Sequence, residues 1–243
     1  MEIKIVYLYY DFLNLYGESG NIKFLKNTLE SLGIKVTIKL LSLKNKLSFK
    51  DYDLVYIGAG TEENQQKVLE HLSLYQKDIL KYINQNKFFL ATGNSVDLLG
   101  KTLMIDGKKV KGLNIFNYNS VNASKRLVGE AIFETKLVKR QILGFQNQNN
   151  EIRNIKHSLF EVKYGIGSYE NSIQEGIHYK NFYGTYLLGP LLVRNPSFGE
   201  YFIKKMIKKK YPKQKVHLDL KLEKLAYNDY IEKNYKDVIE KND

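Results

Sequence analysis

The chain has 243 residues, of which 43% are apolar, so it suits one large α/β domain or one domain with an appendage. The absence of Cys excludes disulfides, thiolate metal sites and cysteine nucleophiles, and the four His are scattered, so we expect neither a metal nor another cofactor. The net charge of +12 comes from lysines that are spread over most of the chain. No apolar run approaches the length of a membrane-spanning helix, about 18 residues, and no signal peptide is apparent. We therefore expect a cytoplasmic protein.

Apolar runs and helical periodicities alternate over the first hundred residues. They predict strands at 3–10, 34–41, 54–57 and 88–92, with a helix ending at Gly33 and one long amphipathic helix from its cap, Thr61, to Ile83. Strands that alternate with helices imply a mainly parallel sheet with helices on both faces. Ligands of such sheets bind at the carboxyl ends of the strands, where we expect residues 58–62 and 92–95 to meet.

The segment 87–100, KFFLATGNSVDLLG, has the pattern of a nucleophile elbow. A buried strand ends in a sharp turn and is followed by a short helical turn, a geometry that exposes one side chain at the end of the strand. Such an elbow normally carries Ser or Cys at its apex, whereas the apex here is Gly93. Glycine tolerates the backbone angles of the turn but supplies no reactive atom.

Beyond Gly100 the pattern changes to short strands. A hairpin is predicted at 103–110, further strands near 115–118, 129–133, 142–146 and 184–188, and a polar loop over 146–154. A helix follows at 196–210, and the charge-rich tail from Val216 is predicted to be helical. We divide the chain into a domain over residues 1–212 and a C-terminal extension over 213–243.

The densest basic segment is Lys204–Lys215, which contains seven Lys and no acid. Such a cluster can bind nucleic acid or an anionic membrane. Arg, the usual base reader, is scarce, and no helix-turn-helix or aromatic-interleaved pattern accompanies the cluster. We therefore interpret it as a solvated face and expect no nucleic-acid partner, with weak association with an anionic membrane as an alternative.

Six dispersed motifs resemble a known family. In chain order they are DFLNLYGESGNI (11–22), DLVYIGAGTEENQ (53–65), LLGK (98–101), GKKVKGLNIF (107–116), KRLVGE (125–130) and EGIHYKNFYGTYLLGPLLVRNP (175–196). Together they resemble the GatD-type glutamine amidotransferase subunits of the CobB/CobQ-like class I group, and several motifs in a fixed order are more specific than any one of them.

The resemblance implies a three-layer class I amidotransferase fold, which is a flavodoxin-like α/β architecture with a mostly parallel central sheet between helices. It also implies a heterodimer with a Mur-ligase-like, ATP-dependent subunit of the MurT type. In that family the amidotransferase subunit hydrolyses glutamine, and the pair uses the ammonia to convert the D-glutamate of the peptidoglycan precursor lipid II to D-isoglutamine.

The positions that the family uses for catalysis are occupied by other residues in this chain. The family elbow reads C-G-G-Y-Q-x-L-G, which places the nucleophile at Gly93, and the family motif G-T-Y-L-H-G-P places the base at Leu188. A third family segment, near E-N-H-G-G, is QNQNN at 146–150. Loss of a nucleophile or base in a comparable hydrolase costs on the order of a million-fold in turnover. We therefore predict that glutaminase activity is absent and that the subunit is a scaffold or regulatory element.

A degenerate site can still bind a ligand. Backbone N–H groups of the glycine-rich loop could hold a small anion or carbonyl, and Arg126 could bind a carboxylate or form a surface ion pair. The candidate residues of this vestigial substrate and oxyanion pocket are Gly58, Ala59, Gly60, Asn94, Ser95 and Arg126.

A relocated nucleophile is the alternative enzymatic reading. Ser95 and Thr92 carry hydroxyls close to the apex, but a hydroxyl needs a base within about 3 Å. We expect none of the remaining acid–base candidates to be catalytic. His178 is interpreted as a packed or hydrogen-bonded surface histidine, His71 as peripheral, and Asp97 as a solvated or locally bonded carboxylate.

Overall fold

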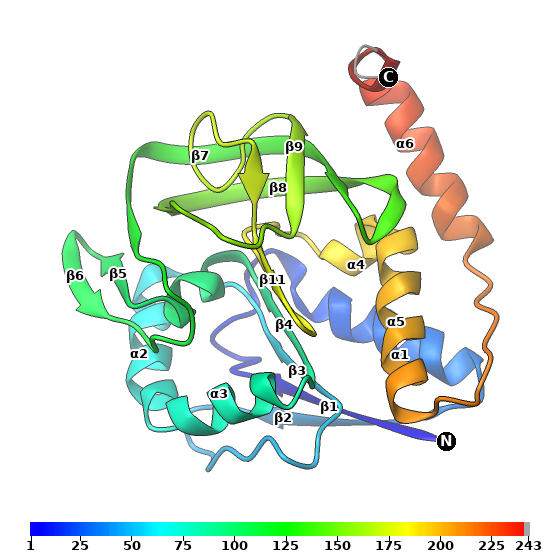
Figure 1. Cartoon of the computed structure of the whole chain (residues 1–243), viewed down its shortest axis with the longest axis horizontal. Coiled ribbons are helices and arrows are strands. Elements are labelled where there is room, and N and C mark those ends of the chain that lie inside the picture. Colours follow the sequence, from blue (N-terminus) through cyan, green and yellow to red (C-terminus); the bar gives the residue numbers. More distant parts are fainter. Residues whose placement is uncertain (241–243) are drawn as a thin grey trace.

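A six-stranded sheet runs through the middle of the computed structural model, which describes residues 1–240 (Figure 1). Its strand order is β11-β12-β4-β3-β1-β2, and all neighbours pair in parallel except β11, which is antiparallel to β12. The strands are β1 (Glu2–Leu8), β2 (Lys35–Leu41), β3 (Leu54–Ile57), β4 (Phe88–Thr92), β11 (Ile177–Tyr179) and β12 (Phe182–Thr185). The predicted mostly parallel α/β sheet is therefore confirmed.

Helices cover both faces of this sheet because its strands alternate between two apolar faces. In β1, Ile3 and Ile5 pack in one core cluster, whereas Val6 and Leu8 pack in the other. The first cluster receives α1 (Ser19–Ser31), α4 (Leu191–Arg194) and α5 (Pro196–Lys210), and the second receives α2 (Glu62–Ser73), α3 (Gln76–Asn84) and the 3₁₀ segment η2 (Gly93–Leu99).

The long helix predicted from Thr61 to Ile83 is two helices. Thr61 caps α2 as predicted, because its hydroxyl accepts the Asn64 N–H at 3.2 Å. The chain leaves the helix at Leu74 and Tyr75, and α3 begins at Gln76. The apolar positions on either side of this break keep a helical spacing, so the sequence pattern does not reveal it.

A second, four-stranded sheet with the order β10-β9-β7-β8 lies beside the first and is antiparallel throughout. It consists of β7 (Ser120–Thr135), β8 (Val138–Ile152), β9 (Phe160–Tyr164) and β10 (Gln174–Glu175). The short strands predicted near 129–133 and 142–146 are parts of the two long strands. The prediction of a polar loop over 146–154 is wrong for residues 146–152, because these belong to β8. The side chains of Gln146, Gln148 and Asn150 are buried in this strand.

Other predictions for the second half of the chain have mixed outcomes. The hairpin is confirmed as β5 (Thr102–Ile105) and β6 (Lys108–Lys111), with Asp106 and Gly107 both at positive φ as a primed turn requires. Helix α5 has the predicted bounds, but residues 115–118 form no strand and β12 ends at Thr185.

Helix α6 (Lys221–Glu240) lies at the side of the second sheet (Figure 1). Tyr227 and Tyr235 pack with Ile132 and Leu143, and the Tyr227 hydroxyl donates to the Gln141 carbonyl at 2.7 Å. The division at residue 212 stays a prediction. No helix in the described part of the chain has the length and apolarity to cross a membrane.

Candidate functional site

The elbow at the end of β4 keeps its sharp turn but has no room for a side chain. Gly93 has φ +61°, in the left-handed region that a glycine adopts at little cost. A Cβ placed on Gly93 would lie 2.4 Å from the Ala59 Cβ and 2.6 Å from the Leu188 Cδ2. Both distances are far inside van der Waals contact, so the methyl of Ala59 and the side chain of Leu188 close the apex.

The loop after β3 meets the elbow, as the parallel topology predicts. The Asn94 side chain forms two hydrogen bonds with Gly60: its Oδ1 accepts the Gly60 N–H at 3.1 Å, and its Nδ2 donates to the Gly60 carbonyl at 2.8 Å. The Gly60 N–H is one of the backbone donors expected to face a ligand oxyanion. The chain's own amide occupies this donor, so it is not free for a substrate.

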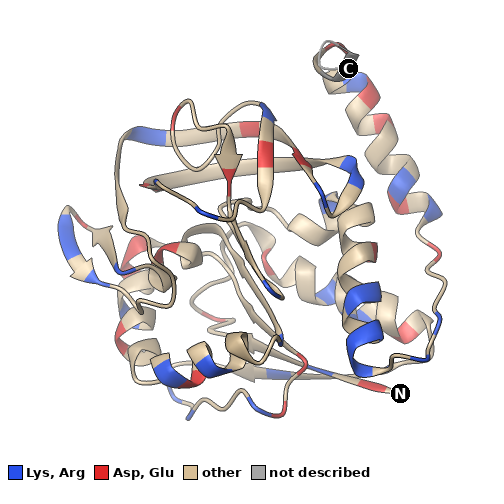
Figure 2. Ribbon diagram, in the orientation of Figure 1, with Lys and Arg blue, Asp and Glu red and all other residues tan. Residues whose placement is uncertain are grey.

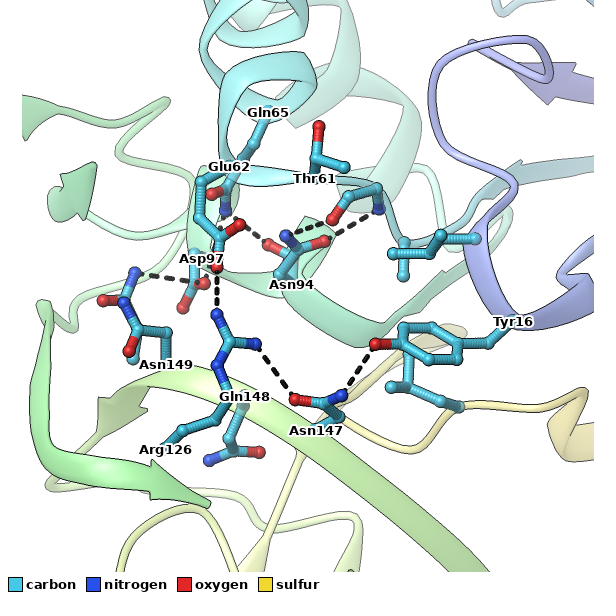
Figure 3. Close-up of a pocket in the computed structure, with 15 residues that line it drawn as sticks. Tyr16, Thr61, Glu62, Gln65, Asn94, Asp97, Arg126, Asn147, Gln148 and Asn149 are labelled. Atoms are coloured by element: carbon cyan, nitrogen blue, oxygen red, sulfur yellow. Dashed lines mark hydrogen bonds and ion pairs between the residues drawn. The ribbon is translucent and has the colours of Figure 1, made fainter. Parts of the chain in front are cut away.

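A pocket of about 160 Å³ opens beside the elbow, between the β3 loop, η2 and β8 (Figure 3). Of the candidate residues, Ala59, Gly60, Asn94, Arg126 and Leu188 line it, whereas Gly58, Gly93 and Ser95 do not. The further lining residues, most of them polar, are Leu15, Tyr16, Thr61, Glu62, Gln65, Asp97, Asn147, Gln148, Asn149 and Asn150.

Ser95 lies behind the pocket. Its hydroxyl donates to the Thr92 carbonyl at 2.8 Å, within its own turn, and its side chain is buried. No general base is among its hydrogen-bond partners.

Arg126 closes the pocket mouth with polar contacts to the chain itself (Figure 3). Its Nη2 lies 2.8 Å from the Glu62 carboxylate, and its Nη1 donates to Asn147 Oδ1 at 2.9 Å. The Asn147 amide donates in turn to the Tyr16 hydroxyl at 2.7 Å. Of the two readings left open for Arg126, the structure has the ion pair, and a carboxylate ligand would have to displace Glu62.

Asp97 is a buried carboxylate at the pocket wall. It accepts hydrogen bonds from the Tyr186 hydroxyl and from the amides of Gln65 and Asn150, the latter two at 3.3 Å. Burial raises the pKa of Asp97, and these hydrogen bonds oppose that rise. Neutral donors distant in sequence thus hold Asp97 in the interior, so the expectation of a solvated or locally bonded carboxylate is wrong.

Glu18 is a buried acid that the sequence did not single out, because it lies in a loop with a polar, glycine-containing sequence. Its carboxylate accepts hydrogen bonds from the hydroxyls of Thr92 and Tyr56. Burial raises the pKa of Glu18 to about 7, although these hydrogen bonds lower it. A proton acceptor therefore does lie against the Thr92 hydroxyl, but none of the three side chains lines the pocket.

The two histidines considered as catalysts have structural contacts away from the pocket. The His178 ring stacks on Tyr183 with 4.8 Å between the ring centroids, and its Nε2 lies 3.1 Å from the Lys180 carbonyl oxygen. His71 Nδ1 lies 2.9 Å from the Tyr9 hydroxyl. Neither imidazole is in reach of the apex residues.

The polar pocket residues of β8 were missed as ligand-facing groups. Gln148 and Asn150 alternate with Asn147 and Asn149 in a strand that the sequence analysis assigned to a loop. Alternating buried polar residues are unusual in a strand, because burying an amide costs free energy unless it is hydrogen-bonded. If residues 146–152 had been assigned to a strand, the alternating polar side chains would have indicated that this strand forms the wall of a polar pocket.

Comparison with known proteins identifies the family of this fold and site. A family model of the CobB/CobQ-like glutamine amidotransferase domain matches residues 4–196. The lipid II isoglutaminyl synthase (glutamine-hydrolyzing) subunit GatD of Streptococcus pneumoniae is 30% identical over 214 residues, which cover 86% of this chain and 82% of that protein. The subunit of the same name from Staphylococcus aureus is also 30% identical, over 210 residues that cover 86% of each chain.

Two solved structures share the fold at low sequence identity. One is a crystal structure of a glutamine amidotransferase, with a TM-score of 0.55 and 12% identity, covering 83% of this chain and 98% of the other. The second is the glutaminase domain of Trypanosoma brucei CTPS with bound acivicin, with a TM-score of 0.51 and 8% identity, covering 88% and 96%. The amidotransferase fold predicted from the resemblance is thereby confirmed.

Proposed function

Because the chain belongs to the CobB/CobQ-like glutamine amidotransferase family, we propose that it is the GatD-type subunit of a lipid II-amidating complex and that its own glutaminase site is inactive. Its partner is a Mur-ligase-like, ATP-dependent subunit of the MurT type in the cytoplasm. The partner takes nitrogen from free ammonia, and this chain acts as a scaffold or regulatory element. The apex at Gly93, closed by Ala59 and Leu188, carries this proposal.

Three chemical requirements of amide hydrolysis are unmet at this site. A carboxamide is attacked only by an activated nucleophile, and Gly93 has no side chain. The leaving amine needs a proton donor, and Leu188 has no ionisable group. The developing oxyanion needs free donors, and the Gly60 N–H is bonded to Asn94 at 3.1 Å. Restoring any one of these groups leaves the other two missing.

The pocket mouth supports a partner-facing role. Leu15 and Tyr16 line the pocket and are each 41% exposed, so two neighbouring large side chains present apolar surface beside it. Tyr16 has φ +62°, a strained angle for a tyrosine, and its hydroxyl is held by Asn147. We expect the partner subunit to cover these two side chains.

The experiment compares nitrogen donors in the reconstituted complex. The chain and its Mur-ligase-like partner are purified together and supplied with ATP and lipid II, with either glutamine or ammonium chloride. We expect amidation with ammonium and neither amidation nor glutamate release with glutamine. A Cys-bearing GatD complex is the positive control, and glutamate release at a comparable rate would contradict the inactive site.

The second candidate function is amide hydrolysis by a relocated hydroxyl nucleophile. The Glu18 carboxylate against the Thr92 hydroxyl is the observation that favours it. An electrophilic glutamine analogue followed by peptide mass spectrometry tests it directly. An adduct on Thr92 or Ser95 would support this candidate, and we expect none, because both hydroxyls are buried outside the pocket.

A further inference from the structure

The amino ends of the parallel strands form the edge of the central sheet opposite the pocket. The C-terminus of α5 reaches this edge, because Lys210 Nζ lies 2.6 Å from the carboxylate of Asp53, which immediately precedes β3. The turn after α5 is fixed to the start of β1, where the Tyr211 hydroxyl donates to the Glu2 carbonyl at 2.8 Å.

Other turns at the same edge also carry lysines. Lys87, just before β4, donates to the carbonyl oxygens of Lys50 and Tyr52. Lys180, in the turn between β11 and β12, donates to the Asn84 carbonyl at the end of α3, at 2.9 Å. Segments far apart in the sequence therefore bring their cations to one side of the molecule.

We define the amino-end face by the seven lysines of these segments. They are Lys50, Lys87, Lys180, Lys208, Lys209, Lys210 and Lys213. Three acids, Glu2, Asp51 and Asp53, lie at this edge. Two of them are paired: the Glu2 carboxylate lies 3.8 Å from Lys35 Nζ, and Asp53 pairs with Lys210. Burial lowers the pKa of Lys87; the Asp53 and Asp51 carboxylates oppose this, and the nearby ammonium groups of Lys210 and Lys209 add to it more weakly.

This face differs from the Lys204–Lys215 cluster recognised in the sequence. Lys204 lies 2.5 Å from the Glu200 carboxylate, and Lys205 donates to the hydroxyls of Tyr183 and Tyr201. These two lysines are satisfied on the side of α5. Lys208 and Lys209 are exposed, and neither pairs with a carboxylate within the described part of the chain. Figure 2 shows that basic residues gather at the C-terminal end of α5.

We propose that the amino-end face docks on an anionic lipid bilayer. Clustered lysines are attracted to anionic headgroups, and the attraction acts within about a Debye length of the surface. The face lies opposite the pocket, so a docked molecule keeps the pocket and its mouth free for a partner. This surface is a property of the chain alone and does not depend on the proposed function.

Lipid suits this face better than nucleic acid. Every cation on it is a lysine, which is a point charge, and the planar fork of arginine that reads bases is absent from the described residues of the face. Three of the lysines lie in the last turn of α5 and the other four in turns and loops, so no single helix presents the whole set to a groove. A broad, flexible set of ammonium groups matches a surface of mobile headgroups.

The test measures vesicle binding of the purified full chain. Vesicles of phosphatidylcholine with about a third phosphatidylserine are compared with pure phosphatidylcholine at about 0.1 M salt, by cosedimentation. We expect binding to the anionic vesicles alone. The triple variant Lys208→Gln/Lys209→Gln/Lys213→Gln should weaken it by about a hundredfold, since each lysine near such a surface contributes about fivefold. All three side chains are exposed, so the variant should fold.

The matched control removes the same charge elsewhere. Lys108→Gln/Lys109→Gln/Lys111→Gln, on the exposed β5–β6 hairpin, should bind vesicles as the wild type does. Equal weakening by both triple variants would show that only net charge matters and would overturn the proposal. Absence of vesicle binding would also overturn the proposal. So would binding to duplex DNA that is tighter than binding to vesicles and that the Lys208→Gln/Lys209→Gln/Lys213→Gln variant loses.

Discussion

Replacing Gly93 with Cys tests the closed apex most directly. A residue with a Cβ at φ +61° costs about 1–2 kcal/mol relative to glycine. Overpacking costs about 1–3 kcal/mol more, because the new Cβ would lie 2.4 Å from the Ala59 Cβ and 2.6 Å from the Leu188 Cδ2. We therefore expect Gly93→Cys to lower the free energy of unfolding by about 2–5 kcal/mol in urea titrations.

A double-mutant cycle separates the two contributions. Ala59→Gly removes the closer methyl, so Gly93→Cys should cost at least about 1 kcal/mol less in that background, while the backbone contribution remains. The same cycle with Leu188→Ala, which removes the Cδ2 atom, tests the second contact. Additive effects in both cycles would show that neither neighbour closes the apex.

Activity gives the second readout of the same perturbation. Gly93→Cys/Leu188→His restores a thiol and an imidazole, but the Gly60 N–H stays bonded to Asn94. Loss of one oxyanion-hole donor costs about a hundredfold to a thousandfold in turnover, so we expect the double variant to remain far below a Cys-bearing relative in a glutamate-release assay. The reasoning would be refuted if Gly93→Cys lowered the free energy of unfolding by less than about 1 kcal/mol and the double variant turned over glutamine as fast as a Cys-bearing relative.

Three further predictions concern buried polar groups. Burial raises the pKa of Glu18 from 4.5 to about 7, so the folded chain retains a proton that the unfolded chain releases, and the free energy of unfolding falls as the pH rises between these values. Glu18→Gln should remove about 3 kcal/mol of that fall, measured by urea titrations at pH 5 and 8. An unchanged dependence of the unfolding free energy on pH would contradict this. Asn195→Ala should lower the free energy of unfolding by about 2–4 kcal/mol in the same titrations, since Asn195 Oδ1 accepts the Leu143 N–H at 2.7 Å and its Nδ2 donates to the Leu143 carbonyl at 2.9 Å. A loss below about 1 kcal/mol would contradict this. Tyr235→Phe removes the hydroxyl bonded to Glu130 and should speed amide exchange in α6 without changing exchange in β4; unchanged α6 protection would show that apolar packing alone holds the helix.

Local sequence patterns gave the predictions that are confirmed: the parallel strands of the first hundred residues, the β5–β6 hairpin and helix α5. Apolar runs such as 54–57 and 88–92 indicate buried parallel strands because they are short, entirely apolar and bounded by polar or turn residues. The glycine at the apex followed from the elbow pattern in the same way. The break at Leu74 and Tyr75 did not, because two helices in the same phase have the same apolar periodicity as one.

The second sheet was predicted less well because its strands carry buried polar residues. Residues 146–150 contain only Gln and Asn, and local propensity assigns such a run to a loop. Their burial in β8 is stabilised by partners distant in sequence, including the Ser168 carbonyl for Gln148 and Asp97 for Asn150. Only the assembled fold supplies these partners.

By itself, the sequence determined the α/β sheet and the family, because these depend on local patterns and ordered motifs. The assignment of Gly93 and Leu188 to the nucleophile and base positions stays a prediction from the resemblance. Only the tertiary structure decided that Ala59 and Leu188 fill the apex, that Asn94 takes the Gly60 donor, and that lysines from four separate segments share one face. Contacts between distant segments depend on how the chain packs, and their distances are set by side chains that no local pattern relates to one another.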